Sequence, residues 1–320
     1  MSDRAHQEEV FYKMRSYRIR CFIAAAALFG AAALMAQQGP PPAPGAPGAN
    51  AGRGGGRGRG GPPRPPAGPT PRLPDDPYLG ANAGKPDLGG NSQSINAKGR
   101  GIWNVPYIVD MQKQGCAADD QACIDSAGRQ HTKPVEVPFN ALGKKMFDEA
   151  TATNSKEDPE GYCLPPGVPR MMYTPYPTEI FQLPERIIFV YEGGAHVWRE
   201  IWMDGRPQPK DPNPTYLGYS TGKWEGDTLV VDTIGLNDRT WLDAAGHRHG
   251  EKLHVTEKYT RTDSNTLKVE ATIDDPDYYT KPWTVVTFAT WYPNQEILEY
   301  ICQENNRDLQ HLVGTGKGGK

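Results

Sequence analysis

The sequence predicts an all-β fold: an antiparallel meander that closes or nearly closes into a barrel, with a β-sandwich as the alternative. From Thr178 onward, short segments rich in β-branched and aromatic residues alternate with turn residues. No long apolar repeat of helical period separates these segments. A sheet of many consecutive strands protects its edges by closing on itself or by folding into two layers.

Nine segments have the composition of strands, and most of them end at residues that favour turns. Asp204-Gly205 and Glu225-Gly226 supply glycine where a tight hairpin needs a positive φ. Consecutive hairpins of this kind favour a calycin-like barrel. The strands are expected at 178–183, 186–192, 196–204, 215–220, 227–235, 252–261, 266–274, 282–292 and 296–303.

One short helix is expected near residues 140–151. Leu142, Met146 and Ala150 recur there at a spacing of four, which places them on one face of a helix.

The first 36 residues predict a secretory signal peptide, with translation beginning at Met1 or at Met14. Three arginines after Met14 precede an apolar, alanine-rich run over 21–36, and polar residues follow it. The run is short for a membrane span. Cleavage after Ala36 would leave a periplasmic or secreted protein with no transmembrane span; an uncleaved anchor is the alternative.

Residues 37–94 are rich in Pro, Gly and Arg and predict a disordered tether. They contain few large apolar side chains, so burial cannot offset the entropy of ordering them. Because such a tether spaces a domain from a surface, association with the cell envelope is an expectation. A single β-rich domain over 95–315 follows, and 316–320 are expected to form a disordered tail.

Charge is divided unevenly along the chain. Residues 1–74 contain ten Lys and Arg against three Asp and Glu, whereas the whole chain has a formal charge of −3, so the remainder carries −10. An acidic domain argues against a nucleic-acid partner.

Loss of a leader would remove Cys21 and leave four cysteines, an even number that predicts disulfides in an exported chain. Cys116 and Cys123 are separated by a short polar stretch, which favours a local bridge. Cys163 would then pair with Cys302 and tie the start of the core to its end. Four cysteines allow three pairings, so the connectivity stays open. A zinc site with four thiolates is the alternative, although paired C-x-x-C spacing is absent.

The domain contains the stretches PEGYCLPPGVPRMMYTPYPTEIFQLP, GKWEGDTLVVDT and NDRTWLDAAGHRH. These stretches resemble a family of exported bacterial all-β proteins that has no assigned role. The resemblance extends over most of residues 95–315 and implies export. It implies no mechanism, so the functional residues have to be argued from their chemistry.

Alternation within the expected strand at 196–204 places an unusual set of side chains on one face. His196 and Glu200 would form an acid–base pair there, beside the rings of Trp198 and Trp202. Inside a barrel this face, together with Tyr191, would form an amphipathic pocket. On the outside, the same histidine and glutamate would lie in water.

The stretch GLNDRTWLDAAGHRHGEKLH, residues 235–254, is expected to be a loop at the rim of the barrel. Asp238 and Arg239 could position or activate a substrate there, with Trp241 as a further ligand contact. Alternatively, Asp238 caps a turn and Arg239 pairs with a neighbouring carboxylate. His247 and His249 are weak candidates for metal ligands, because alternate residues of an extended chain point the same way. A solvated His-x-His is more common, so we expect no metal.

The sequence contains no Rossmann glycines, phosphate-binding loop, G-x-S-x-G elbow or C-x-x-C-H motif, so no cofactor is expected. The function we predict first is an exported barrel that binds a small amphipathic molecule. The first alternative is an enzyme on the same scaffold that performs hydration, isomerisation or hydrolysis by acid–base chemistry, with catalytic residues His196, Glu200, Asp238 and Arg239. The second alternative is a protein that interacts with the cell envelope.

Overall fold

A computed structural model describes residues 66–89, 100–194 and 197–304 of the chain. All described residues belong to one compact unit within Arg64–Lys320. The predicted signal peptide, residues 37–65 and 90–94 of the predicted tether, His196 and the predicted tail lie outside the described residues.

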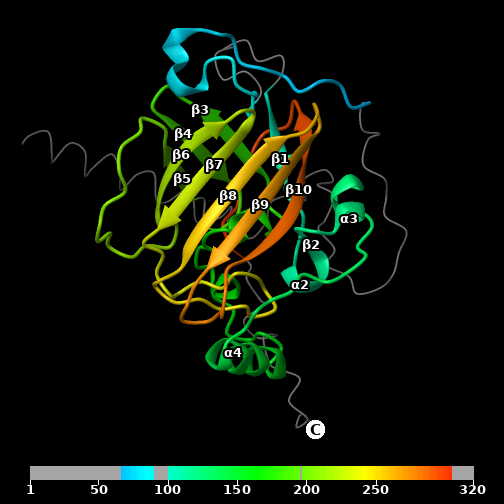
Figure 1. The fold of residues 1–320 in the computed structure, drawn as a ribbon, viewed down its shortest axis with the longest axis vertical. Coiled ribbons are helices and arrows are strands. Elements are labelled where there is room, and N and C mark those ends of the chain that lie inside the picture. Colours follow the sequence, from blue (N-terminus) through cyan, green and yellow to red (C-terminus); the bar gives the residue numbers. More distant parts are fainter. Residues whose placement is uncertain (1–65, 90–99, 195–196, 305–320) are drawn as a thin grey trace, which may run out of the picture. The chain divides into compact units, whose positions relative to one another are not determined.

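Ten strands of the described chain form one sheet, and nine of them close into a barrel (Figure 1). The order around the barrel is β1-β3-β4-β5-β6-β7-β8-β9-β10, and β10 pairs with β1 to complete it. β2 is an extra strand that pairs with β10. The strands are β1 (Gly101–Asn104), β2 (Cys116–Ala117), β3 (Thr178–Gln182), β4 (Arg186–Tyr191), β5 (Trp198–Trp202), β6 (Tyr219–Glu225), β7 (Thr228–Ile234), β8 (His254–Arg261), β9 (Thr266–Asp274) and β10 (Trp283–Pro293).

Strand β9 shows why these segments form a barrel with a packed interior. Buried and half-buried residues alternate along its whole length, so one face points inward and the other outward. Val269 lies on the inner face, where it is level with Tyr259 of β8 and Thr287 of β10, and all three are buried. Each aliphatic side chain buried in this way stabilises the fold by about 1.5–3 kcal/mol.

The predicted barrel is confirmed, with differences in individual strands. β5 and β6 run parallel, because the chain between them crosses back along the outside before β6 begins, so the meander is interrupted once. Gly218 has a φ of 65°, which ends the extended conformation expected at 215–220 and shifts the strand toward Glu225. Residues 296–303 form no strand, and β1 and β2 lie outside the expected set.

Residues 66–89 cover the end of the barrel at which the β3–β4 turn lies. They include the 3₁₀ helix η2 (Pro77–Asn82), and the amide of Asn82 donates a hydrogen bond of 2.7 Å to the carbonyl of Leu183 in that turn. The prediction of a disordered tether over 37–94 is therefore wrong for 66–89, because sparse leucines within a proline-rich segment are enough to anchor it. The buried leucines are Leu73, Leu79 and Leu88.

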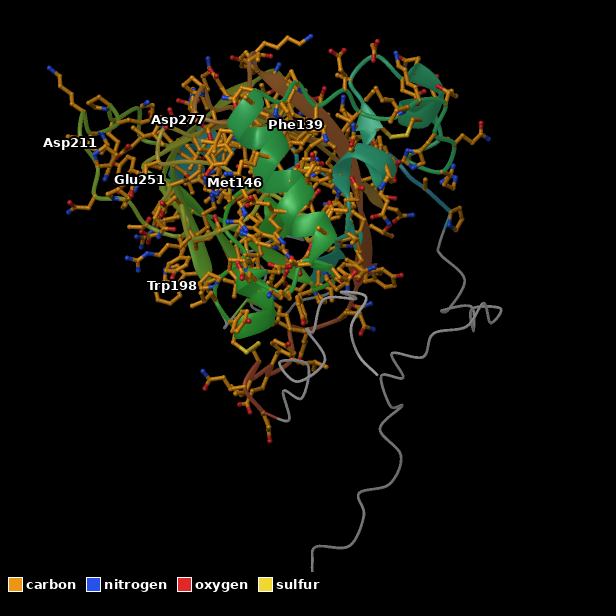
Figure 2. The ribbon with its side chains drawn as sticks, turned by 90° about the horizontal axis from the view of Figure 1, so that it is seen from below. Phe139, Met146, Trp198, Asp211, Glu251 and Asp277 are labelled. Atoms are coloured by element: carbon orange, nitrogen blue, oxygen red, sulfur yellow. A yellow bond between two sulfur atoms is a disulfide. The ribbon has the colours of Figure 1, made fainter. Side chains whose placement is uncertain are left out.

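The chain between β1 and β3 contains most of the helices. Figure 2, seen from below, shows the longest of them, α4, lying across the other end of the barrel, which we call the α4 end. Gly143 lets α4 approach closely, since a Cβ there would lie 2.2 Å from the carbonyl oxygen of Tyr278. The helix expected near 140–151 is confirmed. The helices are α2 (Met111–Gln114), α3 (Gln121–Asp125), α4 (Ala141–Ala152), η3 (Pro159–Tyr162) and η4 (Arg170–Met172).

None of the helices in the described ranges combines the length and the apolar character needed to cross a membrane.

Two disulfides join Cys116 to Cys123 and Cys163 to Cys302. The pairing that the short polar spacing favours is thus the one observed, and no thiolate is left for the alternative zinc site. The second disulfide closes a separation of 139 residues and attaches the segment after β10 to the α4 end.

Candidate functional site

The barrel interior contains a buried ion pair. Arg199 of β5 and Glu257 of β8 point inward, with 2.5 Å between Nη2 and Oε2, and both are almost fully buried. Arg199 also donates to the hydroxyls of Ser220 (3.0 Å) and Thr233 (2.7 Å), and the hydroxyl of Tyr259 donates to Glu257 (2.7 Å). Burial opposes the charge on Arg199, but Glu257 and nearby phenols outweigh burial and raise the pKa of Arg199. The arginine therefore stays charged.

Two phenols of the interior have no hydrogen-bond partner among the described residues. The hydroxyls of Tyr173 and Tyr191 are both buried, and burial raises the pKa of each phenol above its ordinary value. Tyr191, predicted to contact a ligand, is only 1% exposed. Its role in ligand binding stays a prediction.

The face of β5 that was expected to line a pocket points outward. Trp198 is 63% exposed and lies at the periphery in Figure 2. Glu200 forms an ion pair of 2.8 Å with Arg186, and the guanidinium of Arg206 lies 3.7 Å from the ring centre of Trp202. The interior placement of this face is wrong, because alternation defines two faces without saying which is inside. The inner face instead presents Arg199, whose partner comes from a distant strand.

The Asp-Arg pair of the 235–254 loop lies at the surface between buried neighbours. Asp238 and Arg239 are exposed, and the backbone N–H of Arg239 donates to the Asn237 side chain at 3.1 Å. Trp241 is buried, with the guanidinium of Arg248 4.7 Å from its ring centre. No contact joins Asp238 or Arg239 to Glu200 in the described structure, so a catalytic role for these residues stays a prediction.

The second half of this loop is organised by Asp243. One carboxylate oxygen accepts three backbone N–H groups, from residues 245, 246 and 247. The other accepts the N–H of Met111 at 2.8 Å and faces Nδ1 of His247 at 2.7 Å. The His247 ring is fully buried and stacks on Phe139, and its Nε2 has no partner among the described residues. Asp243 thus fixes both the loop backbone and the orientation of His247.

Asp110, Asp243 and His247 come close enough to hold a cation, but the carboxylates of both aspartates already have partners. Asp243 accepts five hydrogen bonds, as described above, and Asp110 pairs with Lys113 at 2.8 Å. The other weak metal candidate, His249, has different partners: its Nε2 lies 2.7 Å from the Thr240 hydroxyl. The His-x-His pair therefore does not converge on one point.

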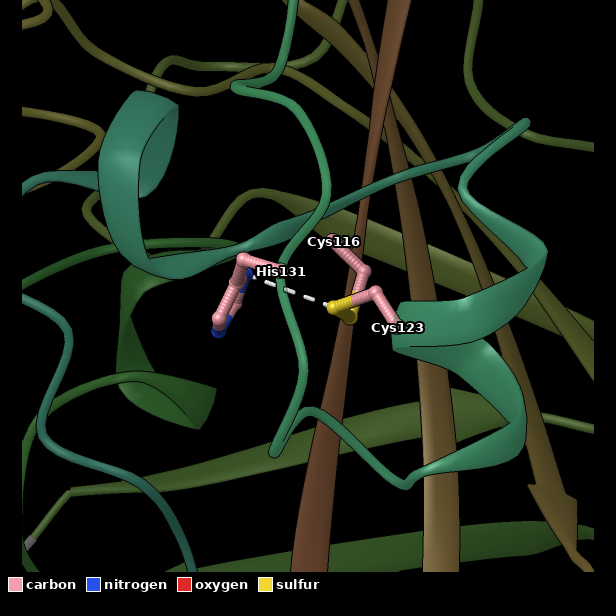
Figure 3. Close-up of side chains that lie close together, drawn as sticks. All are labelled: Cys116, Cys123 and His131. Atoms are coloured by element: carbon pink, nitrogen blue, oxygen red, sulfur yellow. Dashed lines mark hydrogen bonds between the residues drawn. A yellow bond between two sulfur atoms is a disulfide. The ribbon is translucent and has the colours of Figure 1, made fainter.

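Cys116, Cys123 and His131 form a second cluster of metal-ligand types (Figure 3). The two sulfur atoms are joined in a disulfide, so they are not thiolates, and Nδ1 of His131 lies 3.3 Å from the sulfur of Cys123. A metal would require prior reduction of a bridge whose cysteines are both buried. The geometry fits a structural disulfide.

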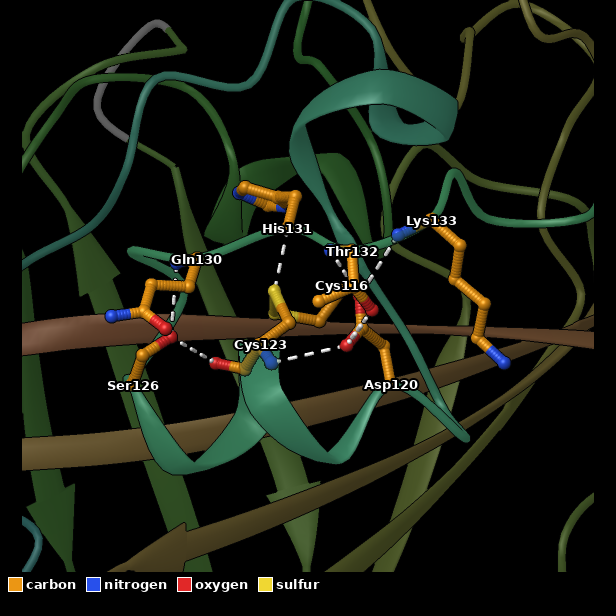
Figure 4. Close-up of a disulfide and its surroundings, with 8 residues drawn as sticks. All are labelled: Cys116, Asp120, Cys123, Ser126, Gln130, His131, Thr132 and Lys133. Carbon is orange, nitrogen blue, oxygen red and sulfur yellow. Dashed lines mark hydrogen bonds between the residues drawn. A yellow bond between two sulfur atoms is a disulfide. The ribbon is translucent and has the colours of Figure 1, made fainter.

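Asp120 joins the two sides of this disulfide loop by hydrogen bonds (Figure 4). Its carboxylate accepts the N–H of Cys123 at the start of α3 and both the N–H and the hydroxyl of Thr132 across the loop. These hydrogen bonds lower the pKa of Asp120 to about 2. The loop is therefore held by one disulfide and several hydrogen bonds to a carboxylate, which is a structural arrangement.

A groove of two adjoining cavities lies at the α4 end. The cavities have volumes of about 570 Å³ and about 360 Å³, and both are lined by Tyr107, Asp158, Gly161 and Ala244. We call the two together the end groove. Cavities of about 300–1,000 Å³ are typical of sites for small molecules.

The larger cavity is mainly apolar. Phe147 of α4 forms one side, and Val109, Ala244 and Ala245 also line it. Ala244 and Ala245 belong to the turn whose backbone Asp243 holds. The 235–254 loop thus reaches a cavity through its Ala-Ala turn and not through its Asp-Arg half.

The smaller cavity is backed by a buried, charged cluster. Arg170 is 4% exposed and donates to both oxygens of Asp158, each at 2.7 Å, and it lies 2.7 Å from Glu160. The hydroxyl of Thr174 donates to the same Glu160 carboxylate. Burial opposes the charge of Arg170, but the two carboxylates raise its pKa. Two carboxylates around one arginine leave an excess negative charge beside the cavity.

Three tyrosines complete the smaller cavity. Tyr107 is 57% exposed, and the hydroxyls of Tyr176 and Tyr300 are 2.8 Å apart. The Cys163–Cys302 disulfide lies beside Tyr300 in the sequence and holds this wall in place. Sequence reasoning missed the end groove, because its residues come from two α-helices and several irregular segments that are far apart in the sequence. The one available signal was the cysteine in PEGYCLPP, within a stretch that is rich in aromatic residues.

Comparison of the chain with protein-family models, with curated proteins and with solved structures found no match in any of the three searches.

Proposed function

We propose that this protein binds a small amphipathic molecule in the end groove. The observation that carries the proposal is the junction of an apolar cavity of about 570 Å³ with a polar one of about 360 Å³. A site with an apolar wall and a few fixed polar groups suits a ligand that has one apolar part and one polar part. The Arg170 cluster and the disulfide support it, because a preorganised site loses little entropy on binding.

Export to an oxidising compartment is part of the proposal. Two disulfides support it, since disulfides persist in the periplasm and outside the cell but are rare in the cytosol. Expression of the full gene and cell fractionation would test it, with the mass of the recovered protein reporting the site of leader cleavage. Recovery of the uncleaved chain from the cytosol would contradict export.

Binding can be tested with N-phenyl-1-naphthylamine, a neutral amphipathic dye whose fluorescence rises in apolar surroundings. We expect saturable binding that weakens by about ten-fold in Tyr107→Ala or Phe147→Ala, because each change removes one wall of the groove. Tyr78→Ala is the matched control, since Tyr78 is 77% exposed and lies in η2 at the other end of the barrel. Equal binding by all three variants and the wild type would contradict a site in the end groove.

A second candidate function is acid–base catalysis, favoured by the Asp243–His247 pair. A carboxylate that holds Nδ1 and leaves Nε2 without a partner is the arrangement of a histidine general base. His247 is fully buried behind Phe147, so catalysis would require α4 to move. Mass spectrometry of a groove ligand before and after incubation tests this function. A ligand recovered unchanged would contradict it, and turnover that persists in His247→Gln would exclude His247 as the base.

A further inference from the structure

The charges that line the end groove are unbalanced. Its acids are Asp110, Asp158, Glu160 and Glu304, and its bases are Lys113 and Arg170. Lys113 is largely exposed and pairs with Asp110 at the apolar cavity. The smaller cavity therefore contains three carboxylates against the single guanidinium of Arg170, a formal excess of two negative charges.

The arginine is not available to an incoming anion. Its terminal nitrogens already donate to both oxygens of Asp158 and approach Glu160, and the side chain is 4% exposed. An anionic ligand would thus face the carboxylates without gaining a new cationic partner. A cation would gain the attraction of Glu160 and Glu304 without breaking any contact described here.

The rings of the smaller cavity favour the same charge. Tyr107, Tyr176 and Tyr300 line it together with the carboxylates. Aromatic faces attract cations through their quadrupole, and the effect is largest for weakly hydrated ammonium groups. Burial and neighbouring carboxylates also raise the pKa of Tyr107, so its phenol stays neutral at physiological pH.

From this combination we infer that the ligand of the end groove is an amphipathic cation: an amine or quaternary ammonium head in the smaller cavity and an apolar body against Phe147 in the larger one. The inference rests on the proposed function and adds the charge of the ligand to it. Neutral and anionic amphiphiles are the competing ligands that the experiment separates.

The experiment compares three probes that share a decyl chain and differ in the head group: decyltrimethylammonium, decyl sulfate and decyl maltoside. Isothermal titration calorimetry would be run on the disulfide-bonded protein, with each probe below its micelle-forming concentration. We expect decyltrimethylammonium to bind at least about ten-fold more tightly than the other two. Its advantage should shrink as salt is raised, because partly exposed charges are screened.

Variants then assign this preference to the smaller cavity. Glu160→Gln removes one negative charge while Arg170 keeps both hydrogen bonds to Asp158, and Glu304→Gln removes one from an exposed position. Both should reduce the preference for the cation by several-fold. Glu270→Gln is the matched control, because Glu270 pairs with Lys268 on β9 away from the groove.

The outcomes separate the inference from the proposed function. Equal affinity for the three head groups, with binding still lost in Tyr107→Ala, overturns the cationic ligand and keeps the groove as a binding site. Tighter binding of decyl sulfate overturns the cationic ligand as well. Absence of binding by every probe, or binding that Tyr107→Ala and Phe147→Ala leave unchanged, overturns the end groove as a site and the inference with it.

Discussion

Arg199 and Arg170 are both buried and both paired with carboxylates, yet their surroundings differ. Arg199 lies inside the barrel with one glutamate, and its remaining donors meet the hydroxyls of Ser220 and Thr233. Arg170 lies behind a cavity at the α4 end with two carboxylates, Asp158 and Glu160. The interior pair is neutral and enclosed, whereas the groove cluster is negative and adjoins open space.

The difference shows that burial of a charge does not by itself indicate function. In an enclosed ion pair the two opposite charges neutralise each other and contact no ligand. Removing one of them therefore mainly lowers the stability of the fold. A cluster with excess negative charge beside a cavity can attract a ligand of opposite charge. Changing the charge of such a cluster should therefore mainly affect ligand binding. Four predictions test this division, in order of the expected size of the effect.

Glu257→Gln should have the largest effect on stability. It leaves the Arg199 guanidinium buried without a counter-charge, which typically costs about 3–5 kcal/mol of the free energy of unfolding. Urea denaturation at pH 7 would measure the loss. Glu270→Gln serves as the control, since its pair with Lys268 is partly exposed and worth about 0–1 kcal/mol. If both variants lost a similar amount of the free energy of unfolding, enclosed and surface ion pairs would not differ in their contribution to stability.

Replacement of Cys163 and Cys302 by serine should cost about 2–4 kcal/mol and weaken binding in the end groove. The bridge spans 139 residues and holds the wall that contains Tyr300. Cys116 and Cys123 are only 7 residues apart, so replacing both should lower the free energy of unfolding by less, because loop entropy grows with loop length. This second variant should leave binding in the end groove unchanged. Thermal denaturation and probe titration of both variants would decide. Undiminished binding without the long bridge would contradict its role in the groove.

The double change Arg199→Met with Glu257→Leu should cost less stability than Glu257→Gln, because it leaves no buried charge without a counter-charge, although the buried hydroxyl of Tyr259 loses its acceptor. Binding of the decyl probes in the end groove should be unchanged, since both residues lie in the barrel interior. A large loss of probe affinity in this variant would show that the interior pair and the groove are coupled.

These regions also differ in how far the sequence predicts them. The barrel strands are readable because residues such as Val269 recur with a period of two, and hairpins follow at glycine turns. The inward position of Arg199 is not readable, because its partner Glu257 lies three strands later along the sheet and alternation treats both faces of β5 alike. The end groove combines residues of α2 and α4, such as Phe147, with irregular chain held by a long disulfide. Because these segments are distant in sequence, no local pattern indicates that they meet.

The smallest predicted effect concerns His249, whose burial disfavours its charged form. Nδ1 lies 3.0 Å from the carbonyl oxygen of Gly250 and therefore donates, and Nε2 lies 2.7 Å from the hydroxyl of Thr240, which can donate to the neutral ring. Burial lowers the pKa of His249 below its ordinary value of 6.5. In the unfolded chain the imidazole gains a proton as the pH falls through 6.5, whereas the folded protein resists protonation.

The unfolded state then binds more protons, so the free energy of unfolding is fully retained above pH 6.5 and declines below it until the folded imidazole also titrates. One proton contributes a slope of at most about 1.4 kcal/mol per pH unit. Urea denaturation at pH 7, 6 and 5 should show this decline in the wild type and a shallower one in His249→Asn, whose amide can still donate to the Gly250 carbonyl but cannot titrate. Identical slopes for the two proteins would mean that the folded His249 takes up its proton as readily as the unfolded one, and that its burial at the α4 end is not maintained in solution.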